Sequence, residues 1–282
     1  MSPRQEAPVH RFTHEAMATV FEVFVAGKDE TYAGQAARAA FDEVDRFERL
    51  FSRFDPSSET SRIGRLQPGE SLRIGIETAE VLGIAAAVQA ETGGAFDINY
   101  LAGARPAGKR PKASPPALAT LIRVAQTGQG FEVARLAGIR KAKAPPLLLD
   151  FGAVGKGYAL DRMAEVLAEW DITAALLHSG TSTALALGAP RCGRAGWRLA
   201  LRDPGDEAAE PLGWVVLSGL AFSGSATTHQ THIVDPRRRL AVPGDRAAWA
   251  VAASAAEADA LTTALCVMEI GEVERYCLQH EG

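Results

Sequence analysis

A lysine and three glycines lie between two aspartates in the stretch LDFGAVGKGYALD, residues 149–161. An apolar run at residues 147–151 predicts a strand that enters this turn, and a helical pattern follows it. Backbone N–H groups at a helix N-terminus, together with Lys156, suit an anion such as a phosphate. The glycine spacing is neither that of a P-loop nor that of a dinucleotide fingerprint. Taken alone, the stretch fits an anion site and an ordinary strand-to-helix turn equally well.

A second candidate for chemistry lies in SAAEADALTTAL, residues 254–265. Ser254 followed by Glu257 forms a capping-box pattern, which predicts that a helix begins there. Asp259 and Thr263 are four residues apart and therefore share one face of that helix. A carboxylate and a hydroxyl are hard oxygen ligands that suit Mg²⁺, although such pairs on helices are common and usually solvated. Together with the glycine-rich stretch, they predict a magnesium and pyrophosphate site.

Strand and helix patterns alternate irregularly around these candidates. Residues 19–25 are rich in β-branched and aromatic side chains, whereas residues 32–51 and 77–91 carry apolar residues at helical spacing. In the second half, apolar runs separated by turn signals are interrupted by helical patterns at residues 156–170 and 255–269. The predicted fold class is α+β, with a mixed, largely antiparallel sheet flanked by helices.

Composition limits the classes of partner. With 47% apolar residues among 282, the chain has enough for a sizeable core. A net charge of −4 leaves no basic footprint for nucleic acid, so we expect none as a partner. Three widely spaced cysteines predict neither a disulfide framework nor a zinc site. With no signal peptide, lipoprotein cysteine or apolar run long enough for a bilayer, we expect a cytoplasmic protein without a membrane span.

The proline-rich segment AGARPAGKRPKASPPA, residues 102–117, is the one strongly biased stretch. Four prolines with several Lys and Arg residues predict an exposed loop. Such a loop would serve equally well as a domain boundary or as a lid.

Seven stretches, in order along most of the chain, carry a further signal: AMATVFEVFV, FERLFSRFDPSSETSRIGRL, TGGAFDI, LDFGAVGKGYALD, LLHSGTSTALALG, SGSATTHQTHIVDPR and EADALTTAL. Together they resemble the motifs of the FAD:protein FMN transferases, the ApbE family. The resemblance implies a single ApbE-like flavin transferase domain over residues 1–282. The segment SGSAT, residues 223–227, is also similar to the Ser-Gly-Ala-Thr type of sequence that the family modifies, but an ordinary turn of the family explains it better.

The resemblance also implies roles for individual residues. Mg²⁺ would be bound beside the FAD pyrophosphate by the main-chain carbonyl of Ala153 and by Asp259 and Thr263. His232 would act as the base that activates the acceptor hydroxyl, and Lys156 would face the pyrophosphate. The implied FAD site consists of Met17, Ala95, Phe96, Asp97, Asp150, Lys156 and His232.

The implied reaction attaches the FMN half of FAD to a threonine of an acceptor protein and releases AMP. The residues suit this chemistry, because a metal and a lysine neutralise the pyrophosphate while a base removes the threonine proton. Two alternatives remain open: a FAD pyrophosphatase that yields FMN and AMP, and a non-catalytic flavin-binding protein. His232 by itself also fits a structural histidine, and a zinc pair with His229 has no further ligands to support it.

Several positions depart from the family pattern. Thr181 and Ser182 replace its second glycine and acid, Ala18 stands where a glycine is usual, and Arg238 replaces a threonine. The sequence stops at Gly282, soon after the last helical pattern, so we expect the family's usual C-terminal strand to be missing or truncated. These departures bear on contacts to the flavin and its ribose.

Overall fold

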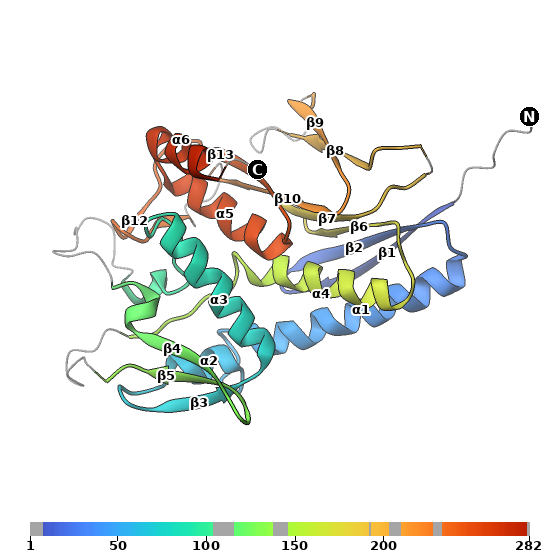
Figure 1. Cartoon of the computed structure of the whole chain (residues 1–282). Coiled ribbons are helices and arrows are strands. Elements are labelled where there is room, and N and C mark those ends of the chain that lie inside the picture. The colour runs from blue at the N-terminus through green and yellow to red at the C-terminus, as the bar shows by residue number, and fades with distance from the viewer. Residues whose placement is uncertain are drawn as a thin grey trace, which may run out of the picture. The chain divides into compact units, whose positions relative to one another are not determined.

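The computed structural model describes residues 8–103, 116–137, 146–191, 193–202, 210–227 and 233–280. The chain divides into two compact units. Figure 1 shows the whole chain with its helices and strands labelled. Unit 1 is Met1–Glu48, Lys156–Ser225 and Trp249–Asp259, and unit 2 is Arg49–Gly155, Ala226–Ala248 and Ala260–Gly282. Most of the predicted proline-rich loop lies outside the described residues.

Unit 1 is built on a six-stranded sheet with the order β1-β2-β6-β7-β10-β13. The pairs β1–β2, β2–β6, β6–β7 and β7–β10 are antiparallel. The strand predicted at residues 19–25 is confirmed as β2. The bounds are β1 (Val9–Ala16), β2 (Thr19–Ala26), β6 (Ala175–Ser179), β7 (Thr183–Leu187), β10 (Leu220–Ala226) and β13 (Ala247–Ala252).

Three helices begin or run within unit 1: α1 (Glu30–Phe51), α4 (Gly155–Glu169) and α5 (Ala255–Val267). The rings of Phe47 and Tyr158 meet edge to face at 5.4 Å, which joins α1 to α4, and Figure 1 shows both helices running along the sheet. The helices predicted at residues 32–51 and 156–170 are confirmed, because apolar side chains at helical spacing bury one face of each.

A separate antiparallel hairpin, β8 (Trp197–Leu201) and β9 (Gly213–Leu217), packs on the sheet through a buried cluster that includes Trp197, Leu217 and Leu176. The apolar run WVVLSGLAFSG, residues 214–224, looks like one strand in the sequence, but the structure divides it between two strands. Gly219 takes φ +69°, a conformation suited to glycine, and the chain turns there. The two halves of the run therefore become β9 and β10, in different sheets.

Unit 2 contains a three-stranded antiparallel sheet, and α3 lies against two of its strands. The helix predicted at residues 77–91 is confirmed as α3, and Gly93 and Gly94 follow it with φ of +58° and +79°. The elements are α2 (Glu59–Gly64), β3 (Ser71–Ile74), α3 (Ile76–Glu91), η1 (Tyr100–Gly103), η2 (Leu118–Thr120), β4 (Ile122–Thr127), β5 (Gly130–Arg135), β11 (Val234–Asp235), β12 (Leu240–Ala241) and α6 (Ile270–Gln279).

The predicted fold class, α+β with a largely antiparallel sheet and flanking helices, is confirmed. The prediction of a single domain over the whole chain remains a prediction, since each compact unit combines three segments of sequence. Within the described ranges, none of the helices combines the length and apolar character needed to cross a membrane.

Candidate functional site

Met17 lies in the two-residue turn between β1 and β2. Met17 and Ala18 have φ of +51° and +58°, the left-handed pair that a tight hairpin turn requires. The Met17 N–H donates to the Glu48 carboxylate on α1 at 2.7 Å. The turn is thus held to a helix, and its backbone tolerates Ala18 at a position where glycine would be less strained.

The lysine and the aspartate predicted from separate motifs meet in unit 1. Lys156 Nζ lies 3.9 Å from Oδ2 of Asp259. Asp259 is buried, with 5% of its surface exposed. The Asp259 carboxylate also accepts hydrogen bonds from the Gly157 N–H and the Thr183 hydroxyl. Burial raises the pKa of Asp259, and the positive charge of Lys156 opposes that rise. This carboxylate is therefore held in place by three groups in a desolvated setting.

The N-terminus of α5 is capped by a residue from α4. Asp161 accepts from the N–H groups of Ala255 at 2.7 Å and Ala256 at 3.0 Å, and from the Ser254 hydroxyl at 2.8 Å. Ser254 in turn accepts from the Glu257 N–H at 3.3 Å, as its capping pattern predicted. Asp161 was missed as a functional residue in the sequence, although it closes the glycine-rich motif. Its role is to fix the start of the helix that carries Asp259.

Gly157 allows α4 and α5 to approach closely. A Cβ atom at this position would lie 2.2 Å from the Ala255 carbonyl oxygen and 2.7 Å from the Cα of Ala256. No side chain fits there without moving the backbone of α5. The second glycine of the Gly-Lys-Gly sequence is therefore needed for packing between helices.

In unit 2, Asp150 is held on several sides. Its carboxylate accepts from the Gly152 N–H at 2.9 Å and from the Tyr100 hydroxyl at 3.2 Å, and it lies 3.3 Å from Arg53 Nε. Burial and the charge of Asp150 raise the pKa of Tyr100 to about 12, so the phenol remains a donor at neutral pH. Arg53, which sequence reasoning missed, balances the charge of the carboxylate.

The prediction of a strand at residues 147–151 is wrong, because this segment is not part of any of the described sheets. Its backbone pairs with a turn instead. The Asp150 N–H donates to the Ile98 carbonyl and the Leu148 N–H donates to the Asn99 side-chain oxygen, both at 2.8 Å. The segment is therefore fixed to the turn at Ile98 and Asn99, directly after Phe96 and Asp97 of the predicted FAD site.

The Ala95–Asp97 stretch is buried along its whole length. Ala95, Phe96 and Asp97 are only 1%, 3% and 7% exposed. Asp97 accepts from the Asn99 N–H at 2.8 Å and from Gln89. Burial raises the pKa of Asp97 to about 6, against the effect of these two hydrogen bonds.

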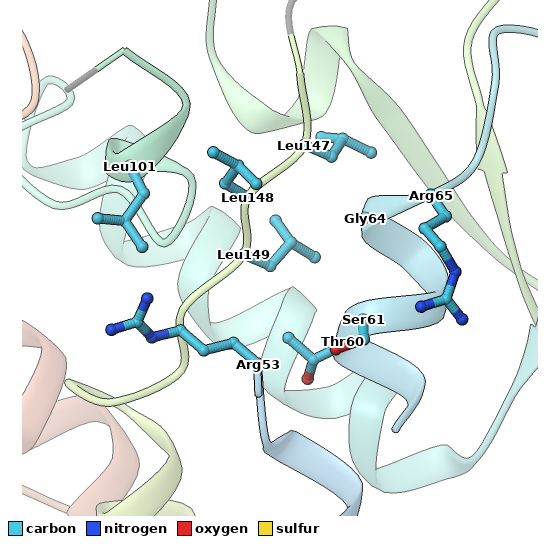
Figure 2. Close-up of a pocket in the computed structure, with 9 residues that line it drawn as sticks. All are labelled: Arg53, Thr60, Ser61, Gly64, Arg65, Leu101, Leu147, Leu148 and Leu149. Carbon is cyan, nitrogen blue, oxygen red and sulfur yellow. The ribbon is translucent and has the colours of Figure 1, made fainter. Parts of the chain in front are cut away.

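A pocket of about 450 Å³ opens beside Asp150 in unit 2. Figure 2 shows three leucines of the extended segment and one of η1 on one side, with residues of α2 opposite. Arg53, which pairs with Asp150, contributes a guanidinium to the rim. The lining residues are Arg53, Thr60, Ser61, Gly64, Arg65, Leu101, Leu147, Leu148 and Leu149.

The predicted site residues fall on both units, and the structure documents contacts within each unit. Unit 1 holds Met17, Lys156 and Asp259, and it brings the last two together. Unit 2 holds Ala95, Phe96, Asp97, Asp150, Ala153 and Thr263, and it joins the Asp97 turn to the Asp150 segment. His232 and His229 lie outside the described residues.

The predicted metal ligands suit a hard cation in chemical type. Thr263 follows Asp259 by one turn of α5, and Ala153 lies in the turn just before α4. The oxygen atoms that these residues offer to a metal come from a carboxylate, a hydroxyl and a main-chain carbonyl, which are hard ligands that suit Mg²⁺. In the part of the chain that the structure describes, no three His, Cys, Asp or Glu side chains gather into a further metal-binding group.

The fold is that of the solved flavin transferases. It matches the Flavin Transferase ApbE from Vibrio cholerae with a TM-score of 0.77 at 19% identity, covering 98% of this chain and 92% of the other. The family model described as the ApbE family matches residues 17–282, so the chain belongs to the ApbE family, as its motifs predicted.

Two curated relatives carry the same kind of name. The FAD:protein FMN transferase of Klebsiella pneumoniae strain 342 is 27% identical over 273 residues, which cover 90% of this chain and 77% of the relative. The FAD:protein FMN transferase of Salmonella typhimurium strain LT2 is 25% identical over 275 residues, with the same coverage.

Proposed function

We propose that this chain is a FAD:protein FMN transferase that moves the FMN half of FAD to a threonine of an acceptor protein and releases AMP. Two relatives that bear this name, together with the family match over residues 17–282, support the proposal. The observation that carries it is the pairing of Lys156 with the buried Asp259 where α4 and α5 begin. A cation for a pyrophosphate and a carboxylate for a metal are thereby placed in one small region.

Asp259, Thr263 and the Ala153 carbonyl would hold Mg²⁺, which when bound offsets negative charge on the pyrophosphate. Asp259 suits this role because its carboxylate is already desolvated and oriented by Gly157 and Thr183. A buried carboxylate whose pKa is raised gains most from a cation, since the cation favours its charged form.

FAD binding would use Met17, Ala95, Phe96, Asp97, Asp150, Lys156 and His232. Ala95 and Phe96 are buried, and they adjoin Asp97, whose hydrogen bond from the Asn99 N–H fixes the local backbone. Lys156, in the first turn of α4, adds its charge to the N–H groups of a helix start, and both favour an anion.

In the transfer step, the threonine oxygen of the acceptor attacks the phosphorus of the FMN half of FAD. The bond between that phosphorus and the bridging oxygen breaks, and AMP leaves with the bridging oxygen. His232 would take the threonine proton, and Lys156 would stabilise the charge that develops on the departing phosphate.

The test uses the full-length protein with FAD, Mg²⁺ and a peptide that contains Ser-Gly-Ala-Thr. A peptide heavier by one FMN group, with AMP formed in equal amount, is the expected result from mass spectrometry and chromatography. AMP and free FMN with no change in the peptide would indicate a FAD pyrophosphatase instead. Bound flavin without AMP would indicate a non-catalytic flavin-binding protein.

A further inference from the structure

Two buried hydroxyl groups, those of Thr183 and Ser223, form a hydrogen-bonded series with Asp259 in unit 1. Thr183 begins β7 and Ser223 lies opposite it on β10, in register across the antiparallel pair. Thr183 is 1% exposed and Ser223 is 0% exposed. Their oxygens are 3.0 Å apart, and the Thr183 hydroxyl also bonds to the Asp259 carboxylate.

The direction of these hydrogen bonds follows from counting protons. An ionised carboxylate only accepts, so the single proton of the Thr183 hydroxyl points to Asp259. The Thr183 oxygen must then accept in its bond with Ser223, and Ser223 must donate. The result is a chain of donors from β10 through β7 to the carboxylate on α5.

The hydrogen-bonded hydroxyls of Ser223 and Thr183 fix the orientation of the Asp259 carboxylate from the strands β10 and β7. The Gly157 N–H fixes it from α4. The Gly157 N–H is a fixed backbone donor, and Gly157 itself is packed against Ala255. A carboxylate held by two fixed donors loses little further freedom when a cation binds, and such supporting bonds commonly tune metal affinity.

We propose that Thr183, supported by Ser223, is a positioning residue that orients Asp259 for the divalent cation. The inference rests on the metal role given to Asp259 under the proposed function. It adds a requirement that the motif resemblance did not supply: a hydroxyl at position 183, directly after the departures at Thr181 and Ser182.

The experiment measures Mg²⁺ binding to the full-length protein by isothermal titration calorimetry, with FAD present throughout. Thr183→Val keeps the shape of the side chain but removes the donor, and it should weaken Mg²⁺ binding by about 10-fold to 100-fold. Thr183→Ser keeps the hydroxyl and should bind within about 2-fold of wild type. Ser223→Ala removes only the outer donor, and it should cause a smaller loss of about 2-fold to 5-fold.

Thr78→Val serves as the matched control. Thr78 is a fully buried threonine on α3, in unit 2, so the substitution tests the general cost of changing such a residue. It should leave Mg²⁺ affinity unchanged even where it shifts the melting temperature. A purely structural role for Thr183 predicts that Thr183→Val loses stability without losing Mg²⁺ affinity.

Two outcomes would overturn the proposal and are distinguishable. Wild-type Mg²⁺ affinity in Thr183→Val, with affinity lost in Asp259→Ala, would leave the metal site standing and remove the positioning role. Wild-type affinity in Asp259→Ala would show that the metal site of the proposed function is itself wrong. Should Thr183→Val fail to fold, Ser223→Ala decides, since unchanged affinity there would also contradict the donor chain.

Discussion

Lys156 and Asp259 are 103 positions apart in the chain, yet Nζ of the first lies 3.9 Å from Oδ2 of the second. The contact exists because α4 and α5 cross at Gly157 and because Asp161 of α4 caps the start of α5. The Lys156 cation and the buried Asp259 carboxylate thus lie near the N-termini of two helices that are held together by the Asp161 cap and by the close packing at Gly157. Each of the two groups has a different expected effect when it is removed.

Lys156→Ala should weaken FAD binding by about 10-fold to 100-fold, the range expected for loss of a charged hydrogen bond. The reason is that a cation facing the pyrophosphate at a helix start would be lost. Lys156→Arg should retain most of the affinity, and Lys28→Ala, which removes a lysine stacked on Tyr32, should retain all of it. Calorimetry with FAD in Mg²⁺ buffer provides the measurement, and unchanged affinity in Lys156→Ala would contradict the role of this loop.

Asp259→Asn should abolish AMP release without unfolding the protein. Burial raises the pKa of Asp259, so the folded state holds this proton more tightly than the unfolded state does. The charged form therefore costs stability as the pH rises above the unfolded value, and a neutral amide avoids this cost at pH 7. Without ligands, the melting temperature of the variant should be higher than that of wild type or at most a few degrees lower.

The same variant should not respond to ligands. Wild type should gain melting temperature when Mg²⁺ and FAD are added together, whereas Asp259→Asn should gain little. Thermal melts with neither, either and both ligands check this expectation. A full metal-dependent gain in the variant would remove the main chemical support for the metal site.

Local signals in the sequence were sufficient for much of the fold. The start of α5 follows from a Ser254 cap, and the end of α3 follows from two glycines that take positive φ. By contrast, β1 was not recognised, because its sequence VHRFTHEA is rich in polar residues and it becomes a strand by pairing with β2. Its stability comes from the partner strand, which no local pattern reveals.

The site shows the same division. Lys156, Asp150 and Asp259 were found from motifs, because their neighbours in sequence are distinctive. Arg53 and Thr183 were missed, because their partners are distant in the chain: Arg53 pairs with Asp150, and Thr183 bonds to Asp259. Only the packing of strands and helices brings such supporting groups to a carboxylate, so sequence spacing cannot predict them.

Gly157→Ala should destabilise the protein by about 1 to 3 kcal/mol, as expected for an added methyl group in a packed core. The Cβ atom would collide with the backbone of α5 at Ala255, and the start of that helix would have to move. Gly83→Ala is the matched control, since a Cβ there meets nothing within 4 Å in the interior of α3. It should stabilise by about 0.5 to 1 kcal/mol, so urea unfolding of the two variants should give opposite signs.

Asp97 should make the stability of the protein fall as the pH rises from about 4 to about 6. Its folded pKa of about 6 lies above the ordinary value of 3.8, so the folded state binds more protons than the unfolded state in this window. The stabilisation present at low pH, about 3 kcal/mol by order of magnitude, is lost as Asp97 ionises. Asp97→Asn keeps an acceptor for the Asn99 N–H but cannot ionise, so it should remove this part of the pH dependence.

Urea unfolding of wild type and Asp97→Asn between pH 4 and pH 7 isolates this contribution. Asp161 and Asp259 also have raised pKa values and slope in the same direction, so the difference between the two proteins is the relevant quantity. Glu272 provides a contrast, because its hydrogen bond with Arg237 lowers its pKa. Its contribution is lost as the pH falls through that lowered pKa, so Glu272→Gln should lose stability at neutral pH relative to wild type. Parallel pH profiles for wild type and Asp97→Asn would show that folding does not raise the pKa of Asp97, which would contradict the effect of its burial.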